Sequence, residues 1–122
     1  MTDLGARGEA LAAARLEQAG WRILARNWRF GHREIDLIVE RDGIVAFVEV
    51  KTRAGPAFGH PAEAITARKR RDLARAAQAW VLRNGRPEWV YRFDAIAVWW
   101  PPQGPPRLEH IEDAWRLEPE SR

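Results

Sequence analysis

The chain contains no cysteine and no long apolar run. Without cysteine there can be neither a disulfide nor a zinc site built from thiolates, which is typical of a reducing compartment. No stretch approaches the roughly 20 apolar residues of a membrane span. The N-terminal segment has no apolar run behind a basic start, so it does not predict a secretory signal. We therefore expect a soluble, cytoplasmic protein that has no membrane partner.

Lysine is almost absent, whereas arginine is abundant. Only Lys51 and Lys69 are lysines among the 20 basic residues, and the net charge is +3. Arginine binds phosphate through a planar fork that lysine lacks. The composition therefore suits a polyanionic partner such as nucleic acid, and it fits an arginine-rich GC-rich genome equally well.

The length of 122 residues is typical of one domain. We expect residues 1–122 to form it, with residues 116–122 frayed at the C-terminus. Helical spacing predicts a helix over residues 4–19 with Asp3 as its N-cap, and a second helix from the Thr66 cap to residue 83. Alternation predicts strands at residues 21–30, 34–41, 44–51 and 90–100, and a short edge strand at 108–111.

The predicted order is helix, three strands, helix, then one or two strands. Because the second helix can return the chain as a crossover, this order favours an α/β fold with a mixed central sheet flanked by helices.

The most informative segment is a hairpin around Asp42-Gly43. Asp-Gly between two alternating apolar runs is a strong hairpin signal. A two-residue loop sets the register so that Asp36 faces Glu49 and Glu34 faces Lys51. The alternation then predicts one wholly apolar face, formed by Ile35, Leu37, Val39, Ile44, Ala46, Val48 and Val50.

The opposite face of the hairpin collects charge at its far end. Like charges that face each other across two strands are destabilising, so Asp36 and Glu49 call for a compensating cation. Mg²⁺ prefers one or two carboxylates together with water and phosphate. Lys51, on the same face, could orient a water or stabilise charge on a phosphate. The alternative is an ordinary cross-strand ion cluster, in which we expect Glu34 to pair with Lys51.

The chain resembles the YraN-type uncharacterised bacterial proteins. They look like members of the PD-(D/E)xK nuclease superfamily and are similar to archaeal Holliday-junction resolvases. The resemblance covers nearly the whole chain and rests on the segments GEALAAARLEQAGWRILARNWR, EIDLI, FVEVKTR, FGHPAEAITARKRRDLARAAQAWV and RFDAIAV. It implies a restriction-endonuclease-like core of the order α-β-β-β-α-β.

The resemblance also implies roles for individual residues. Asp36 matches the metal-binding Asp, and Glu49 and Lys51 match the acidic residue and the lysine of the D/E-x-K step. Glu9 matches the additional carboxylate that completes many such sites, so the metal set is Asp36, Glu49 and Glu9. Relatives usually have glycine before the Glu-Ile-Asp segment, where this chain has Arg33.

Several basic residues are candidates for phosphate contact. Four of them open the second helix, whose positive N-terminus favours anions, although such a run is often only a solvated helix face. The candidate nucleic-acid-binding residues are Arg29, Arg53, Arg68, Lys69, Arg70 and Arg71. Asn27 could contact phosphate or equally be a turn residue. The Gly/Pro-rich segment 54–61 is either a mobile flap over substrate or a surface loop, and we favour the surface loop. Asp94 is interpreted as structural, paired with Arg92 or with another arginine.

The sequence thus leads to three functional hypotheses. In the first, the protein is an endonuclease that hydrolyses phosphodiesters with Mg²⁺ or Mn²⁺, on DNA and in particular on branched DNA. In the second, it retains the nuclease fold but only binds nucleic acid or a protein. In the third, it is a structural or interaction protein with no nucleic-acid role, and its many tryptophans and arginines serve an interface. By analogy with resolvases, a homodimer is also expected.

Overall fold

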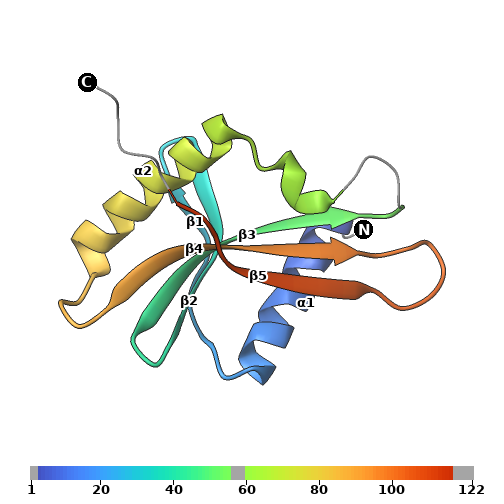
Figure 1. Ribbon diagram of the computed structural model, residues 1–122, viewed down its shortest axis with the longest axis horizontal. Helices are drawn as coiled ribbons and strands as arrows, with labels where there is room; N and C mark the ends of the chain where they lie inside the picture. The colour runs from blue at the N-terminus through green and yellow to red at the C-terminus, as the bar shows by residue number, and fades with distance from the viewer. Residues whose placement is uncertain (1–2, 56–59, 117–122) are drawn as a thin grey trace.

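The computed structural model describes residues 3–55 and 60–116, so the outer part of the expected frayed end and the centre of the 54–61 loop lie outside the described residues. Figure 1 shows a sheet with one helix on each side. The elements in chain order are α1 (Leu4–Gln18), β1 (Arg22–Phe30), β2 (Arg33–Arg41), β3 (Ile44–Arg53), the short 3₁₀ helix η1 (Pro61–Ala64), α2 (Ala67–Asn84), β4 (Val90–Trp99) and β5 (Arg107–Trp115).

The five strands form one sheet in the order β1-β2-β3-β4-β5. β3 and β4 are parallel and are joined through η1 and α2, whereas the other neighbours are antiparallel. This arrangement confirms the expected mixed α/β sheet with an α-β-β-β-α-β core. The last strand is longer than the expected 108–111, because its pairing with β4 runs from Arg107 to Trp115.

The predicted helix starts are confirmed by their caps. The Asp3 carboxylate accepts a hydrogen bond from the backbone N–H of Ala6, and the Thr66 hydroxyl accepts one from Lys69 N–H at 3.1 Å. Each cap satisfies a donor that the first helical turn leaves without a partner. Among the described residues, no helix combines the length and the apolar content needed to cross a lipid bilayer.

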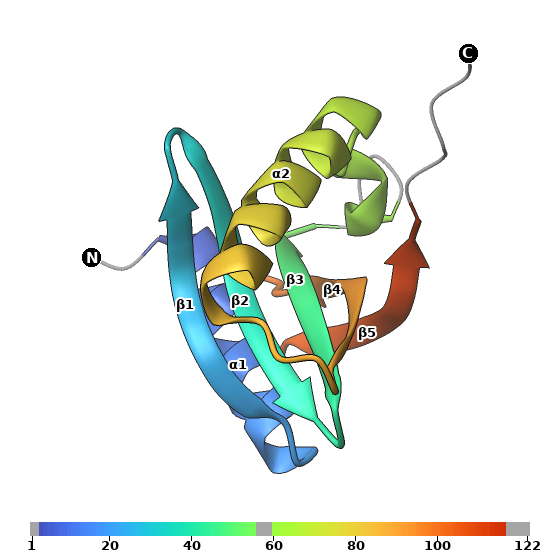
Figure 2. The same ribbon diagram turned by 90° about the vertical axis from the view of Figure 1, so that its left-hand side faces the viewer.

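Two apolar clusters hold the helices against the sheet. The cluster under α1 includes Ala12 and Leu16 together with Val48 and Val50 of β3. The cluster under α2 includes Leu73 and the neighbouring Ala76, Ala77 and Trp80, packed on the other face of the strands. As Figure 2 shows, α2 lies in front of the sheet and α1 lies behind it.

The predicted hairpin register is confirmed over the part nearest the turn. Pairing runs from Arg41 with Ile44 to Leu37 with Val48, and Asp42 and Gly43 both have positive φ, at 52° and 82°. Such φ values suit a two-residue hairpin turn. The pairing ends one residue before Asp36 would meet Glu49. Figure 2 shows β2 and β3 separating toward this end.

The prediction of a single apolar hairpin face was wrong for Ile35. Leu37, Val39 and Val48 lie in the cluster under α1 as expected, but Ile35 is buried in the cluster under α2. Regular alternation fails here because β2 has left β3 by this point and pairs only with β1. The separation of the two strands allows Asp36 to approach α1.

Candidate metal centre

Three carboxylates converge where β2 leaves β3. Glu9 of α1 and Glu34 and Asp36 of β2 each offer an oxygen, and these oxygens all lie within 4.8 Å of one another. Asn27 of β1 links two of them, because its Nδ2 donates to Glu9 Oε1 at 2.7 Å and to Glu34 Oε1 at 3.0 Å. Side chains from α1, β1 and β2 are therefore held together at this point.

Asp36 connects this group to β3. Its Oδ2 accepts a hydrogen bond of 2.8 Å from Val50 N–H, a donor released where the two strands part. Glu49 lies beside Asp36, and its Oε1 is 3.8 Å from Lys51 Nζ. The structure thus brings together Asp36, Glu49, Lys51 and Glu9, the four residues predicted to form the catalytic set.

Burial makes these carboxylates hard to ionise. It raises the pKa of Asp36 to about 7, and the negative charge of Glu49 adds to the effect. Burial also raises the pKa of Glu49, against the opposing influence of Lys69 and Lys51. The pKa of Glu9 is raised by burial and then by the charge of Asp36. Carboxylic acids with raised pKa values that face one another are typical of functional sites.

Among the residues that the structure describes, two buried side-chain oxygens have no hydrogen-bond partner, Oε2 of Glu49 and Oγ1 of Thr52, and only the first belongs to a carboxylate. Glu49 is only 4% exposed, and its Oε2 has no donor when the neighbouring Asp36 is ionised. A buried carboxylate oxygen left unsatisfied is costly, and a divalent cation is the ligand that satisfies it most directly. Hard oxygen donors are also what Mg²⁺ and Mn²⁺ prefer. By this criterion the residues present fit the predicted metal.

A close approach of α1 to β3 places Glu9 in the centre. Gly8 is buried, and a Cβ at this position would lie 1.9 Å from Thr52 Oγ1. Only glycine permits this contact. Helix α1 therefore packs closely against β3, the strand that carries Glu49 and Lys51. Glu9 is the next residue after Gly8, so this close packing positions its side chain near the centre.

The predicted pairing of Glu34 with Lys51 was wrong. Glu34 Oε2 pairs with Arg29 Nε at 3.1 Å, and Lys51 pairs with Glu49 instead. The cause is again the separation of the strands, which removes Glu34 from the register position opposite Lys51. Arg33, at the position where the resemblance leads us to expect glycine, forms an ion pair with Asp72 of α2 at 3.2 Å and thereby ties the start of β2 to that helix.

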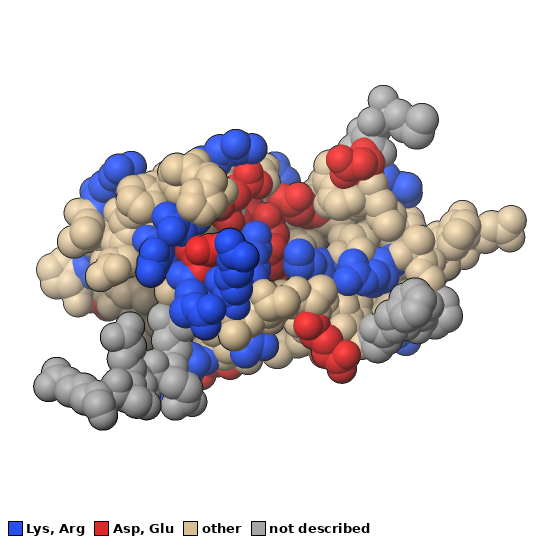
Figure 3. Space-filling model, turned by 90° about the horizontal axis from the view of Figure 1, so that it is seen from above, with Lys and Arg blue, Asp and Glu red and all other residues tan. Residues whose placement is uncertain are grey.

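The basic residues predicted to contact nucleic acid divide into two groups. The first group is exposed and consists of Arg53, Arg68 and Arg71. The positive charge of Lys69, which is half-buried, lowers the pKa of both Asp36 and Glu49. Arg70 is held within the fold, because its Nε donates to Ile65 O at 3.2 Å and its guanidinium lies 5.3 Å from the Trp115 ring centre. Figure 3 shows acidic side chains near the middle of this face with basic ones on several sides.

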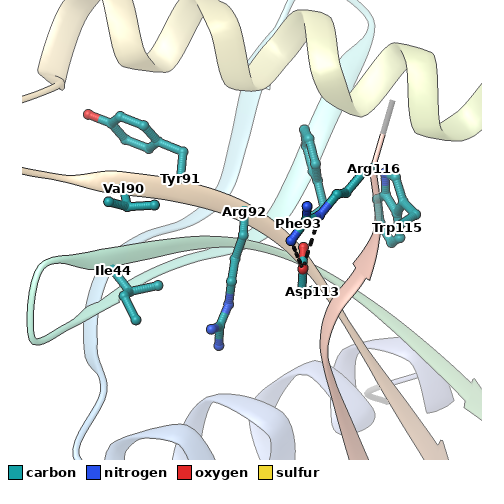
Figure 4. Close-up of a pocket in the computed structure, with 8 residues that line it drawn as sticks. All are labelled: Ile44, Val90, Tyr91, Arg92, Phe93, Asp113, Trp115 and Arg116. Atoms are coloured by element: carbon teal, nitrogen blue, oxygen red, sulfur yellow. Dashed lines mark hydrogen bonds and ion pairs between the residues drawn. The ribbon is translucent and has the colours of Figure 1, made fainter. Parts of the chain in front are cut away.

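A larger hollow lies elsewhere and lacks this chemistry. It has a volume of about 440 Å³ and is lined by Ile44, Val90, Tyr91, Arg92, Phe93, Asp113, Trp115 and Arg116. Figure 4 shows Tyr91 on the α2 side of β4 and Arg92 directed the other way. Arg116 is paired with Asp113. This hollow is lined mainly by aromatic and aliphatic side chains and has a single carboxylate, which is paired with Arg116, so the carboxylate centre is the better candidate for catalysis.

Sequence analysis missed the role of Asn27. Its φ of 48° is unusual inside a strand, and this backbone conformation accompanies the side chain's contacts to Glu9 and Glu34. Asparagine tolerates positive φ better than most residues, which was the only available signal. The interpretation of Asp94 as structural was confirmed by its contacts to Arg92 at 2.9 Å.

The raised pKa values predict how stability depends on pH without metal. The unfolded chain ionises Asp36 near pH 4, whereas the folded protein keeps its proton until about pH 7. Stability therefore falls as the pH rises through this window. The Asp36→Asn variant removes the effect and should be more stable at pH 8 in EDTA, on the order of 2 kcal/mol, or roughly 5–8 °C in Tm.

The measurement is thermal unfolding of both proteins from pH 5 to pH 8. The Tm difference should grow with pH, and Glu17→Gln, an exposed carboxylate on α1, should show no such trend. An Asp36→Asn variant that is no more stable than wild type at pH 8 would contradict the burial of this charge.

Fold and site together define a class of protein: a small α/β domain whose sheet carries a carboxylate cluster and a lysine where two strands part. Within that class, the chain belongs to the uncharacterised protein family UPF0102, whose model matches residues 8–98. This span contains the whole cluster and confirms the family-level resemblance to YraN-type proteins.

Relatives from distant bacteria share much of the sequence. A UPF0102 protein of Chloroherpeton thalassium is 50% identical over 94 residues, which cover 77% of this chain and 73% of that protein. One from Nocardia farcinica is 46% identical, covering 89% and 86%. One from Geobacter sulfurreducens is 47% identical, covering 93% and 89%.

Proposed function

We propose that this protein is a metal-dependent endonuclease that hydrolyses phosphodiester bonds in DNA. The observation that carries the proposal is the buried Oε2 of Glu49, which has no partner among the described residues and lies beside Asp36, while Oε1 of the same carboxylate is 3.8 Å from Lys51 Nζ. A carboxylate pair with a lysine is the equipment that metal-assisted phosphodiester hydrolysis needs. The same three residues match the PD-(D/E)xK pattern, which supports placing the chain in that nuclease superfamily.

Each residue has a distinct task in this proposal. Asp36 and Glu49 would hold Mg²⁺ or Mn²⁺, and Glu9 would contribute from α1. The bound cation supplies positive charge beside the scissile phosphate. Lys51 is 29% exposed at its side chain, whereas its partner Glu49 is only 4% exposed. Its ammonium can orient a water for attack on phosphorus and can stabilise the charge on the phosphate oxygens.

The surrounding basic residues suit a nucleic-acid substrate. Arg68 and Arg71 are exposed on the first turns of α2, and Arg53 is exposed two residues beyond Lys51. Exposed guanidinium groups on these two elements can contact phosphates next to the one that is cleaved. The resemblance to junction resolvases favours branched DNA as the substrate.

The test is cleavage of linear, flapped and four-way DNA by the purified full chain. We expect cleavage with Mg²⁺ or Mn²⁺, none with EDTA, and none by Glu49→Gln. Glu17→Gln serves as a control for the loss of one negative charge on the surface. Binding of DNA should weaken steeply with salt. Salt-sensitive DNA binding without cleavage of any of the three substrates would identify a binding module and overturn the proposal.

A further inference from the structure

We infer that a hollow beside Trp99, at the carboxyl ends of β3 and β4, receives one unpaired nucleobase of the DNA that the carboxylate centre cleaves. The inference rests on the proposed function and adds to it a class of substrate, a strand that is not fully base-paired near the cleaved bond. No residue of the carboxylate centre lines this Trp99 hollow. The two places can therefore be tested separately.

The Trp99 hollow has the size and the walls of a site for a single base. Its volume is about 230 Å³, which is room for about eight water molecules at liquid density. That space suits one flat ring system and is too small for a base pair. An indole ring and two pyrrolidine rings give the hollow apolar walls, and a guanidinium adds positive charge. The described residues that line it are Ala54, Gly55, Trp99, Pro101, Pro105 and Arg107.

The sheet places this hollow close to Lys51. β3 and β4 are parallel and pair regularly up to Arg53 with Trp99, and Figure 1 shows their arrowheads ending side by side. Lys51 and Arg53 lie at even spacing from Phe47, and Trp99 from Ala95, two residues of the cluster under α2. All three therefore project on the α2 side of the sheet. Trp99 lies two residues beyond the level of Lys51, roughly 7 Å along the strands, or about two nucleotide steps.

Cations beside the hollow remain available for phosphate. The guanidinium of Arg107 lies 5.0 Å from the centre of the Trp99 ring, and Arg53 is exposed on β3 beside Trp99. No carboxylate among the described residues forms an ion pair with Arg53 or Arg107, whereas Arg29 and Arg92 are each paired. Any base can stack on an aromatic ring, and a guanidinium can bind the phosphate of the same strand. The walls and the charge together fit a nucleotide.

Contacts with η1 and β5 hold the Trp99 ring in place. The His60 ring meets it edge-on, with ring centroids 5.2 Å apart and an angle of 89° between the planes. His60 is itself fixed, because its Nδ1 accepts from Ala62 N–H at 3.0 Å and its Nε2 lies 3.3 Å from Glu109 Oε1. A ring that is already held in place loses little conformational freedom when a base stacks on it.

The experiment measures binding of flapped DNA to the full chain in EDTA, which prevents metal-dependent cleavage. In a series of substrates, one base of the single-stranded arm at a time is replaced by an abasic site, which retains the phosphate. Wild type should bind about tenfold more weakly when the missing base is the one that enters the hollow, because stacking on the indole is lost. This part of the test needs no variant protein.

Variants then assign the effect to Trp99. Trp99→Ala should lose about the same factor with the intact arm and lose nothing more at the abasic position, and Trp99→Phe should regain most of the affinity. Trp89→Ala is the matched control and should bind like wild type. Trp89 is also half-buried, with the Arg86 guanidinium 4.9 Å from its ring centre, but it precedes β4 at the opposite end of that strand.

Cleavage separates this inference from the proposed function. With Mn²⁺, Trp99→Ala should lose about tenfold more cleavage on flapped DNA than on linear DNA. An abasic effect below about twofold at every position, or a Trp99→Ala variant that binds like Trp89→Ala, would overturn the base site and leave the nuclease proposal intact. A position-specific abasic effect without cleavage of any substrate would overturn the proposed function and retain the base site.

Discussion

Replacing Asp36 with asparagine should lower metal-dependent DNA cleavage by at least ~10³-fold. Asp36 lies between the carboxylates of Glu9 and Glu34 and that of Glu49. One of its oxygens lies within 4.8 Å of an oxygen of Glu9 and of Glu34, and Oδ2 accepts a hydrogen bond from Val50 N–H. Asparagine preserves the shape and the acceptor for Val50 but removes the charge that holds a cation.

The Lys51→Ala variant should bind the metal but cleave DNA poorly, so it distinguishes a role in metal binding from a role in the chemical step. It should reduce cleavage by a comparable ~10³-fold, because the ammonium acts on the water and the phosphate. It should retain Mn²⁺, since the lysine competes with a cation for Glu49 at 3.8 Å. The measurement is single-turnover cleavage together with Mn²⁺ titration for both variants.

Loss of cleavage in Asp36→Asn cannot be assigned to unfolding, because this variant is expected to melt higher than wild type in EDTA. Cleavage within tenfold of wild type in either variant would contradict the assigned roles. So would a Lys51→Ala variant that fails to bind Mn²⁺ although it is folded.

Replacing Asp94 with alanine should cost about 3–5 kcal/mol, or roughly 10–20 °C in Tm. Asp94 is fully buried in β4 and accepts hydrogen bonds from Arg92, His110 and Asp113 N–H at 2.9, 2.7 and 2.9 Å. These contacts tie β5 to the sheet. Removing the carboxylate leaves a largely buried guanidinium without its main partner.

Asp113→Asn is the matched control. Its side chain pairs with Arg116, which is 84% exposed, so this ion pair contributes little. Asparagine also tolerates the φ of 49° at this position. The control should melt within about 3 °C of wild type. An Asp94→Ala variant that melts as high as this control would show that the buried network does not stabilise the sheet.

The two kinds of buried acid differ in the direction of their pKa shifts. Burial alone would raise the pKa of Asp94, but hydrogen bonds from His110, Asp113 N–H and Arg92 lower it below the ordinary value. Its stabilisation is therefore present at neutral pH and is lost as the pH falls below about 4. Asp36 lacks enough partners and shifts upward. The buried carboxylate of Asp94, whose oxygens accept several hydrogen bonds, stabilises the fold. The carboxylate of Asp36, which has fewer donors around it, is better placed to bind a cation.

Much of the fold follows from local signals in the sequence. The caps at Asp3 and Thr66 and the Asp42-Gly43 turn set element boundaries and register, and all three were confirmed. The register in turn placed Asp36, Glu49 and Lys51 near one another. These signals act over a few residues, which is why they can be recognised in a single sequence.

The rest of the site depends on where regular structure fails. The ladder between β2 and β3 ends at Leu37, Asn27 adopts a positive φ, and Ile35 changes face. No local pattern predicts such irregularities, because they accompany contacts between segments far apart in the sequence, such as Asn27 with Glu9 and Asp36 with Val50. The pairing of Glu34 with Arg29 and the anchoring of Arg70 were missed for this reason.

The most direct test of the central claim is the anomalous scattering of Mn²⁺ in crystals of the wild-type protein at pH 8. We predict a peak between Asp36 and Glu49, with carboxylate oxygens at about 2–2.5 Å from the metal. Oε2 of Glu49, which lacks a protein partner, should be one of its ligands. Crystals grown with millimolar Mn²⁺ that show no peak within reach of these two carboxylates would contradict the assignment of a metal centre.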